Sequence, residues 1–132
     1  MASNSWINYK IYCPSYKRYT TARSHLIFPK DKFIYVVRQE ELEHYKKQLP
    51  DNEFMAIPEG AVSNISNTRN WILDNKISDQ VVMVDDDYKS MQWCLRRELI
   101  KLSPEDIDFF IQNMISMCIE GEMGMFGLNT LN

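Results

Sequence analysis

Apolar runs alternate with amphipathic segments along most of the chain. Runs rich in aromatic and β-branched residues predict strands at 7–13, 33–37, 54–57 and 80–84. Amphipathic or helix-compatible segments between them predict helices at 20–28, 40–49 and 63–76. The run at 80–84 is short and continuously apolar, which indicates a strand covered on both faces. Strands that alternate with helices predict an α/β fold with a parallel sheet built from βαβ units.

The C-terminal third is less regular. Residues 90–101 are ambiguous, because 91–95 alternate as in an exposed strand while 96–102 suit a helical turn. Ser103, Pro104 and Asp106 form a capping-box pattern that predicts the start of a long helix. Its predicted buried stripe consists of Ile107, Phe110, Ile111, Met114 and Cys118. Gly121 and Gly124 end this helix, and 125–128 begin another strand. We therefore expect one domain over residues 1–132, incomplete at its C-terminus.

Composition narrows the class of protein. The 132 residues carry a net charge of −3, which gives no global basic field for nucleic acid, although Lys89, Arg96, Arg97 and Lys101 form a local basic strip. The three cysteines are far apart in sequence, which argues against a zinc site and against a disulfide framework. The expected compartment is therefore a reducing cytoplasm. The N-terminus lacks the layout of a signal peptide, and no apolar stretch is long enough to span a membrane.

Three consecutive aspartates, 85–87, follow the predicted strand at 80–84. Side chains alternate along a strand, so Asp85 and Asp87 are expected to point one way and Asp86 the other. Neighbouring carboxylates repel each other, and a structure that accepts them usually places a cation between them. Oxygen ligands favour Mg²⁺ or Mn²⁺. A solvated acidic turn explains the same pattern, and both interpretations stay open on the triplet alone.

Polar side chains follow each predicted strand, and in a parallel sheet these exits meet at one edge. The exits carry 15–18, 38–40, Glu59 with Asn64, and the aspartates at 85–87. Basic groups beside carboxylates fit a phosphate group together with a metal ion. Arg69 lies near the N-terminus of its predicted helix, where a bound anion would offset its unfavourable interaction with the helix dipole. The alternative for Arg69 is a solvated side chain on an exposed face.

Three stretches together carry a family resemblance: residues 11–18, 66–70 and 82–87. On these the chain resembles the nucleotide-binding half of a GT-A-type glycosyltransferase. It is most similar to the phage glycosyltransferases associated with TET-type DNA base oxygenases. The resemblance implies a Rossmann-like GT-A fold with a mostly parallel sheet and flanking helices. It also implies a metal-dependent transferase with a nucleotide-sugar donor, a UDP-sugar above all, and hydroxymethylated pyrimidines in phage DNA as acceptor. The location would be the host cytoplasm.

The resemblance also implies roles for the triplet and its basic neighbours. Asp85 and Asp87 match the family's Asp-x-Asp motif and would hold Mn²⁺ or Mg²⁺ on the donor diphosphate. Asp86 would contact the ribose or the donor sugar. Arg18 would lie near the phosphates, and Arg69 would reach the diphosphate.

A second group of residues would bind the nucleoside if the resemblance holds. Pro14, Ser15 and Tyr16 would line its pocket, while Arg38 and Glu40 would flank the base. No residue is a convincing catalytic base, and Glu98 and Glu122 are unsupported candidates. Two alternatives remain: a truncated, non-catalytic module that binds nucleotide, metal or protein, and a different enzyme on a similar sheet, such as a sugar nucleotidyltransferase.

Overall fold

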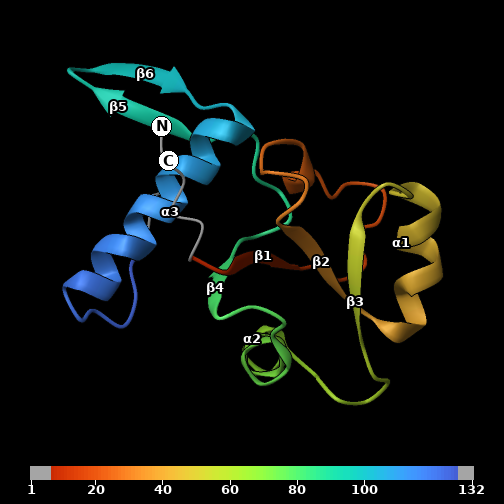
Figure 1. The fold of residues 1–132 in the computed structure, drawn as a ribbon. Helices are drawn as coiled ribbons and strands as arrows, with labels where there is room; N and C mark the ends of the chain where they lie inside the picture. The colour runs from red at the N-terminus through yellow and green to blue at the C-terminus, as the bar shows by residue number, and fades with distance from the viewer. Residues whose placement is uncertain (1–6, 128–132) are drawn as a thin grey trace.

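A computed structural model describes residues 7–127 of the chain, apart from the side chains of Trp93 and Leu95. Its centre is a sheet of four parallel strands in the order β3-β2-β1-β4. The strands are β1 (Tyr9–Pro14), β2 (Phe33–Arg38), β3 (Glu53–Ile57) and β4 (Gln80–Met83). Helices flank this sheet (Figure 1), so the predicted Rossmann-like α/β architecture is confirmed.

Alternate side chains of the strands enter two separate cores. Ile11 and Cys13 of β1 and Tyr35 of β2 lie in one core, and Tyr12 and Val36 lie in the other. Both sets are almost completely buried. A strand buried on both faces needs apolar residues at every position, which explains why β1 and β2 read as continuous apolar runs.

The helices divide between the two faces. Tyr45 of α1 (Leu42–Gln48) and Ile107 of α3 (Pro104–Glu120) lie in the first core, and Ile72 of α2 (Ile65–Asn75) lies in the second. Figure 1 shows α2 below the sheet, α1 to the right and α3 to the left. A 3₁₀ turn, η2 (Gln39–Glu41), precedes α1, so the helix predicted at 40–49 exists but is shorter.

The last helix largely matches its prediction. Ser103 and Asp106 form the predicted capping box at its start. Ile107, Ile111 and Cys118 are buried as predicted, whereas Phe110 and Met114 are half-buried and Ile115 takes a core position. The Tyr9 hydroxyl donates a hydrogen bond to the Asp108 carboxylate and so ties α3 to β1. The predicted start of a strand at 125–128 is wrong for 125–127, and Leu128 lies outside the described residues.

The helix predicted at 20–28 is also wrong. This segment contains a single 3₁₀ turn, η1 (Ser24–Leu26). The backbone N–H groups of Arg23 and Ser24 donate to the Asp86 carbonyl oxygen at 2.8 and 3.3 Å instead of to a helical partner.

Among the described helices, none combines the length and the apolar character needed to cross a bilayer.

The strand β4 and the segment after it differ from expectation. β4 lies at one end of the strand order and is half-buried along its length, so it is not covered on both faces as predicted. The ambiguous residues 90–101 form an antiparallel hairpin of β5 (Gln92–Leu95) and β6 (Glu98–Lys101). This second sheet is separate from the first.

Candidate functional site

The strand order creates a topological switch point between β1 and β4. The connection from β2 to β3 contains α1 on one face of the sheet, and the connection from β3 to β4 contains α2 on the other. The carboxyl ends of β1 and β4 lie side by side, and the Val84 N–H donates to the Tyr12 carbonyl oxygen at 3.1 Å. Ligands of open α/β sheets bind beyond the strand ends at this point. Residues 15–18 and 85–87 leave the two strands there.

Asp86 is the inward-facing member of the triplet. Its residue is 7% exposed, and its two carboxylate oxygens accept hydrogen bonds from different donors. Ser15 Oγ donates to Oδ2 at 2.7 Å, and Arg18 Nη1 donates to Oδ1 at 3.3 Å. Both partners belong to the segment after β1, so a carboxylate after β4 fixes the loop that leaves the neighbouring strand.

Tyr45 of α1 completes a closed ring of hydrogen bonds around this carboxylate. The Arg18 backbone N–H donates to the Tyr45 hydroxyl oxygen at 3.1 Å, and that hydroxyl lies 2.6 Å from Ser15 Oγ. Because the Ser15 proton goes to Asp86, the Tyr45 hydroxyl must be the donor to Ser15. The ring returns to Arg18 through its guanidinium. Three segments distant in sequence are thereby locked at one edge of the sheet.

The backbone of the triplet is held from a second direction by Ser24. The Ser24 hydroxyl donates to the Asp85 carbonyl oxygen and accepts from the Tyr88 N–H at 3.0 Å. Since the Asp86 carbonyl oxygen also accepts from two backbone N–H groups of this segment, the acidic turn has a fixed shape. The segment at 20–28, which was predicted to be a helix, therefore holds the backbone of the triplet in place.

Asp85 and Asp87 are the outward-facing members. Their side chains are 58% and 65% exposed, against 9% for Asp86, so exposure alternates along the triplet although β4 ends at Met83 and Asp86 and Asp87 form a turn. Asp85 Oδ1 lies 3.9 Å from Arg69 Nη2, and Asp87 Oδ2 lies 3.9 Å from Arg18 Nη1. Exposed ion pairs of this length contribute little stability, so these charges remain available to a ligand.

The chemistry of these two carboxylates fits a hard divalent cation. Mg²⁺ is commonly bound by one or two carboxylates, with water and substrate phosphates completing its coordination. Within residues 7–127, no group of three or more His, Cys, Asp or Glu residues is placed to hold a metal ion. Asp85 and Asp87 would therefore supply part of a coordination shell, and phosphate oxygens and water would have to supply the rest.

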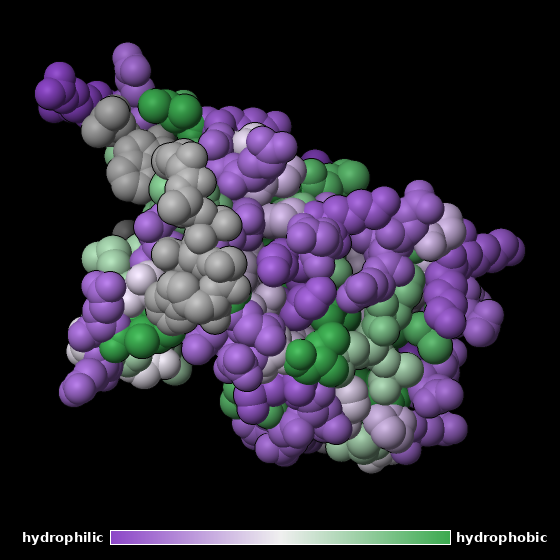
Figure 2. All heavy atoms as spheres, viewed as in Figure 1, coloured by the Kyte–Doolittle hydropathy of each residue, from purple (hydrophilic) through white to green (hydrophobic). Residues whose placement is uncertain are grey.

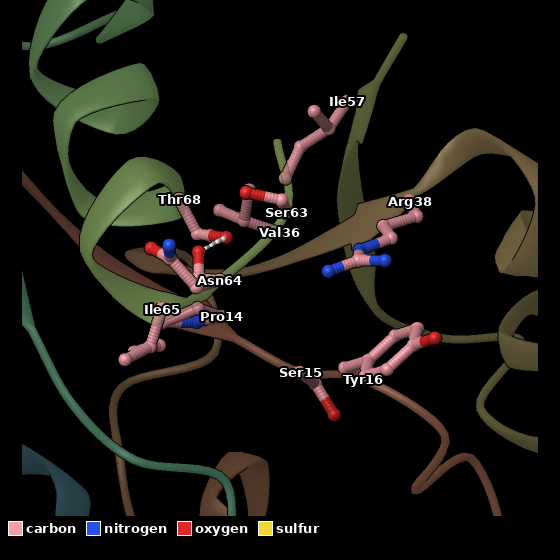
Figure 3. Close-up of a pocket in the computed structure, with 10 residues that line it drawn as sticks. All are labelled: Pro14, Ser15, Tyr16, Val36, Arg38, Ile57, Ser63, Asn64, Ile65 and Thr68. Carbon is pink, nitrogen blue, oxygen red and sulfur yellow. Dashed lines mark hydrogen bonds between the residues drawn. The ribbon is translucent and has the colours of Figure 1, made fainter. Parts of the chain in front are cut away.

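A pocket of about 210 Å³ opens at the carboxyl ends of β1, β2 and β3 (Figure 3), and its lining residue Ser15 connects it to the triplet through Asp86. It is closed on one side by the start of α2, where the Asn64 side chain caps the helix by accepting from the Asn67 N–H at 2.8 Å. Thr68 Oγ1 donates to the Asn64 carbonyl oxygen at 2.9 Å. The pocket is lined by Pro14, Ser15, Tyr16, Val36, Arg38, Ile57, Ser63, Asn64, Ile65 and Thr68.

A stacked pair forms one wall of the pocket. The Arg38 guanidinium carbon lies 3.9 Å from the centre of the Tyr16 ring, and the two side chains are neighbours in Figure 3. This distance is within the range of a cation–π interaction. The pair offers a flat, polarisable surface with hydrogen-bond donors at its edge, next to the apolar side chains of Ile57 and Val36. Such a surface suits a planar heterocycle.

Most of the predicted site residues converge. Pro14, Ser15, Tyr16 and Arg38 line the pocket together, and Arg18 and Arg69 lie against the triplet. Glu40 is exposed in η2 and is not part of the pocket lining. The two candidate bases lie elsewhere: Glu98 begins β6, and Glu122 lies in the turn after α3.

Three positions that support the triplet or line the pocket were not predicted from the sequence. Tyr45 is part of the apolar stripe of its helix, so nothing in the sequence reveals what its hydroxyl contacts. Ser24 lies in a segment predicted to be helical. Thr68 resembles any other polar residue early in a helix. Ile65 of the same helix is half exposed and also lines the pocket.

The buried thiol of Cys13 lies beneath this site. Burial, and next the negative charge of Asp86, raise the pKa of Cys13 well above its ordinary value. Cys13 therefore remains a neutral thiol at physiological pH and is not a nucleophile. The site offers carboxylates, guanidinium groups and hydroxyls, which suit binding of phosphates and a cation.

Comparison with known protein families gives one match. Residues 9–103 match the family model described as TET-Associated Glycosyltransferase. The matched range contains all four strands of the main sheet, the pocket and the triplet. No curated protein and no solved structure is similar enough to the chain to be matched.

Proposed function

The chain belongs to the TET-associated glycosyltransferase family, and from this premise we propose that it binds a nucleotide-sugar donor in the pocket beside the aspartate triplet. The donor class we propose is a UDP-sugar, bound together with Mn²⁺ or Mg²⁺ at Asp85 and Asp87. The proposed acceptor is a hydroxymethylated pyrimidine in DNA. The sugar-nucleotidyltransferase alternative would place a glycine-rich loop after the first strand, and the segment after β1, residues 15–18, contains no glycine.

The observation that carries this proposal is the position of Ser15. Its residue lines the pocket, and its hydroxyl donates to Asp86 at 2.7 Å. The pocket and the triplet are therefore adjacent parts of one rigid surface. A nucleoside in the pocket would direct its diphosphate toward the exposed Asp85 and Asp87 and the two neighbouring arginines.

The residues divide the work of donor binding. Arg38 and Tyr16 would stack against the base, and Pro14 and Ile57 would exclude water from its edge. Arg69 is exposed beside Asp85 at 3.9 Å, so it can turn toward a phosphate oxygen. Arg18 is held by Asp86 through Nη1, and its remaining guanidinium N–H groups can donate to a phosphate. Asp86 would act indirectly, by holding Ser15 and Arg18 in place.

Glycosyl transfer requires the acceptor hydroxyl to bond to the anomeric carbon while the bond to the diphosphate oxygen breaks and the hydroxyl proton leaves. A divalent cation supplies Lewis-acid stabilisation of the charge that develops on the leaving diphosphate. The arginines would add to this stabilisation by charge-assisted hydrogen bonds to the same oxygens. Neither Glu98 nor Glu122 lies in the pocket lining, so we assign no residue as the base.

Thermal unfolding with combinations of metal and nucleotide tests the proposal. A ligand that binds the folded state alone raises its stability by RT ln(1 + [L]/Kd), which is about 2.7 kcal/mol at a hundredfold excess over Kd. We expect UDP with MnCl₂ to raise the melting temperature more than the two separate shifts combined. The same result is expected with MgCl₂. A melting temperature that stays constant under every combination of nucleotide and metal would contradict donor binding.

Replacing Arg38 by alanine tests the assignment of the base pocket. The variant lacks the guanidinium group that would stack against the base. We expect its affinity for UDP with Mn²⁺ to fall by about tenfold, in line with a cation–π contact of about 1–2 kcal/mol. Titration calorimetry measures this change. Lys46→Ala on the exposed surface of α1 removes the same charge and is expected to retain the affinity of the natural chain. Equal losses in both variants would show that charge alone, and not stacking, is responsible.

A further inference from the structure

The hairpin formed by β5 and β6 is a projecting ribbon outside the main sheet. All four residues of β6 are exposed, including Leu99 and Ile100 at 53% and 47%. Figure 1 shows the ribbon at the upper left, above α3. Its base is closed by the Leu102 N–H, which donates to the Met91 carbonyl oxygen at 2.9 Å. An isolated two-stranded hairpin gains little stability by itself, so its presence points to a use beyond folding.

The ribbon is basic on an otherwise acidic chain. Residues 89–101 contain four Lys or Arg residues and one carboxylate, Glu98. The rest of the chain has eleven Lys and Arg against seventeen Asp and Glu. Figure 2 shows hydrophilic residues at the extreme upper left, where Figure 1 places the hairpin turn. A negatively charged partner would therefore be drawn to this ribbon and repelled from most of the remaining surface.

Two arginines occupy the turn itself, in a backbone conformation that disfavours them. Leu95 pairs with Glu98, which leaves Arg96 and Arg97 as a two-residue turn. Their φ angles are 49° and 72°, and both side chains are exposed. Turns with two positive φ angles favour Asn-Gly, because other residues meet steric strain there. A pair of strained arginines at an exposed tip indicates a functional role for their charge.

We propose that this ribbon binds the phosphate backbone of double-stranded DNA, with Arg96 and Arg97 at its tip and Lys89 and Lys101 near its base. The inference rests on the proposed transfer to DNA and names the surface that would hold that acceptor. A two-stranded ribbon fits the major groove of a duplex, and Arg and Lys contacts to phosphates position a protein on DNA. The ribbon begins a few residues after the triplet, so a duplex held along the ribbon is long enough to reach the proposed donor site with one of its bases, whereas a small acceptor cannot contact both places.

A double substitution in the full chain separates charge from folding. Arg96→Asn with Arg97→Gly removes both tip charges and installs the residues that the turn conformation favours. We expect the melting temperature to rise. We also expect the affinity for a fluorescein-labelled DNA duplex of about 20 base pairs to fall by about tenfold, and the slope of log K against log salt to fall by about two. Loss of DNA binding in a more stable protein cannot come from unfolding.

Lys46→Gln with Lys47→Gln is the charge-matched control, because both lysines are exposed on α1, away from the ribbon. This control is expected to bind the duplex as the natural chain does. An unchanged affinity in the turn variant, an equal loss in the control, or equal affinity for heparin would overturn the assignment. Stabilisation by UDP with Mn²⁺ is expected to persist in the turn variant. If the natural chain lacks that stabilisation but binds DNA through the turn, the donor proposal fails and the ribbon assignment stands.

Discussion

Replacing Asp85 and Asp87 together by asparagine is expected to abolish the stabilisation that Mn²⁺ and UDP give, and to lower glycosyl transfer by at least about a hundredfold. Both carboxylates are exposed beside Arg69 and Arg18, so their removal takes away the proposed metal ligands. Asparagine keeps the size of the side chain and one oxygen but removes the charge that a divalent cation requires. Thermal shift measures the binding loss, and product formation from a nucleotide sugar measures the transfer loss.

The fold provides an internal control for this double variant. Because both ion pairs are 3.9 Å long and exposed, we expect the free energy of unfolding without ligand to change by no more than about 0.5 kcal/mol. Chelation with EDTA should reduce transfer by the natural chain to the level of the variant. Full transfer by the double variant would show that the metal site is irrelevant to transfer, whereas the absence of transfer by the natural chain as well would favour its interpretation as a non-catalytic module.

The centre of the sheet could be predicted because β1 and β2 are buried on both faces. A continuous apolar run such as Phe33 to Val37 fits few alternatives, and the parallel arrangement follows from the alternation with helices. Once the strands are parallel, their exits must share an edge. The convergence of Ser15, Arg38 and the aspartates therefore followed from topology without any knowledge of side-chain contacts.

The support of the triplet could not be predicted, because it consists of contacts between distant segments. Tyr45 reaches Ser15 across 30 positions, and Ser15 reaches Asp86 across 71. Local sequence indicated a helix at 20–28, but the Arg23 and Ser24 N–H groups bond to the Asp86 carbonyl oxygen instead. These tertiary hydrogen bonds stabilise the observed conformation more than the weak helix propensity of the segment stabilises a helix.

The hairpin shows a different limit. Residues 91–95 alternate as a strand does, yet no turn signal of the Asn-Gly type marks the connection at 96–97. Arg96 and Arg97 rarely adopt the positive φ angles of this turn, so the sequence suggested a helical turn at 96–102 and not a hairpin. Positions where local preference fails in this way are often functional, and the two arginines agree with that expectation.

Asp86→Asn is expected to act on stability, which the substitution of its two neighbours leaves almost unchanged. It should lower the free energy of unfolding by about 2–3 kcal/mol. The buried carboxylate accepts from both Ser15 Oγ and Arg18 Nη1. An amide has one oxygen, so its NH₂ group must face one of these donors. If Ser15 turns its proton toward Tyr45, the Tyr45 hydroxyl loses its acceptor. If the amide oxygen faces Ser15 instead, the Arg18 guanidinium loses its partner, so every arrangement breaks one of the bonds that hold the loop.

Urea unfolding measures this loss, with an unchanged m-value as the sign that the transition is still two-state. Tyr45→Phe is the companion variant, because it removes the donor to Ser15 and the acceptor of the Arg18 N–H without touching a charge. If the four groups act as one ring, the two substitutions together should cost about 1 kcal/mol less than the sum of their separate costs. Additive losses would mean that the bonds are independent. Asp86 and Tyr45 would then hold the loop separately, and not as members of one hydrogen-bonded ring.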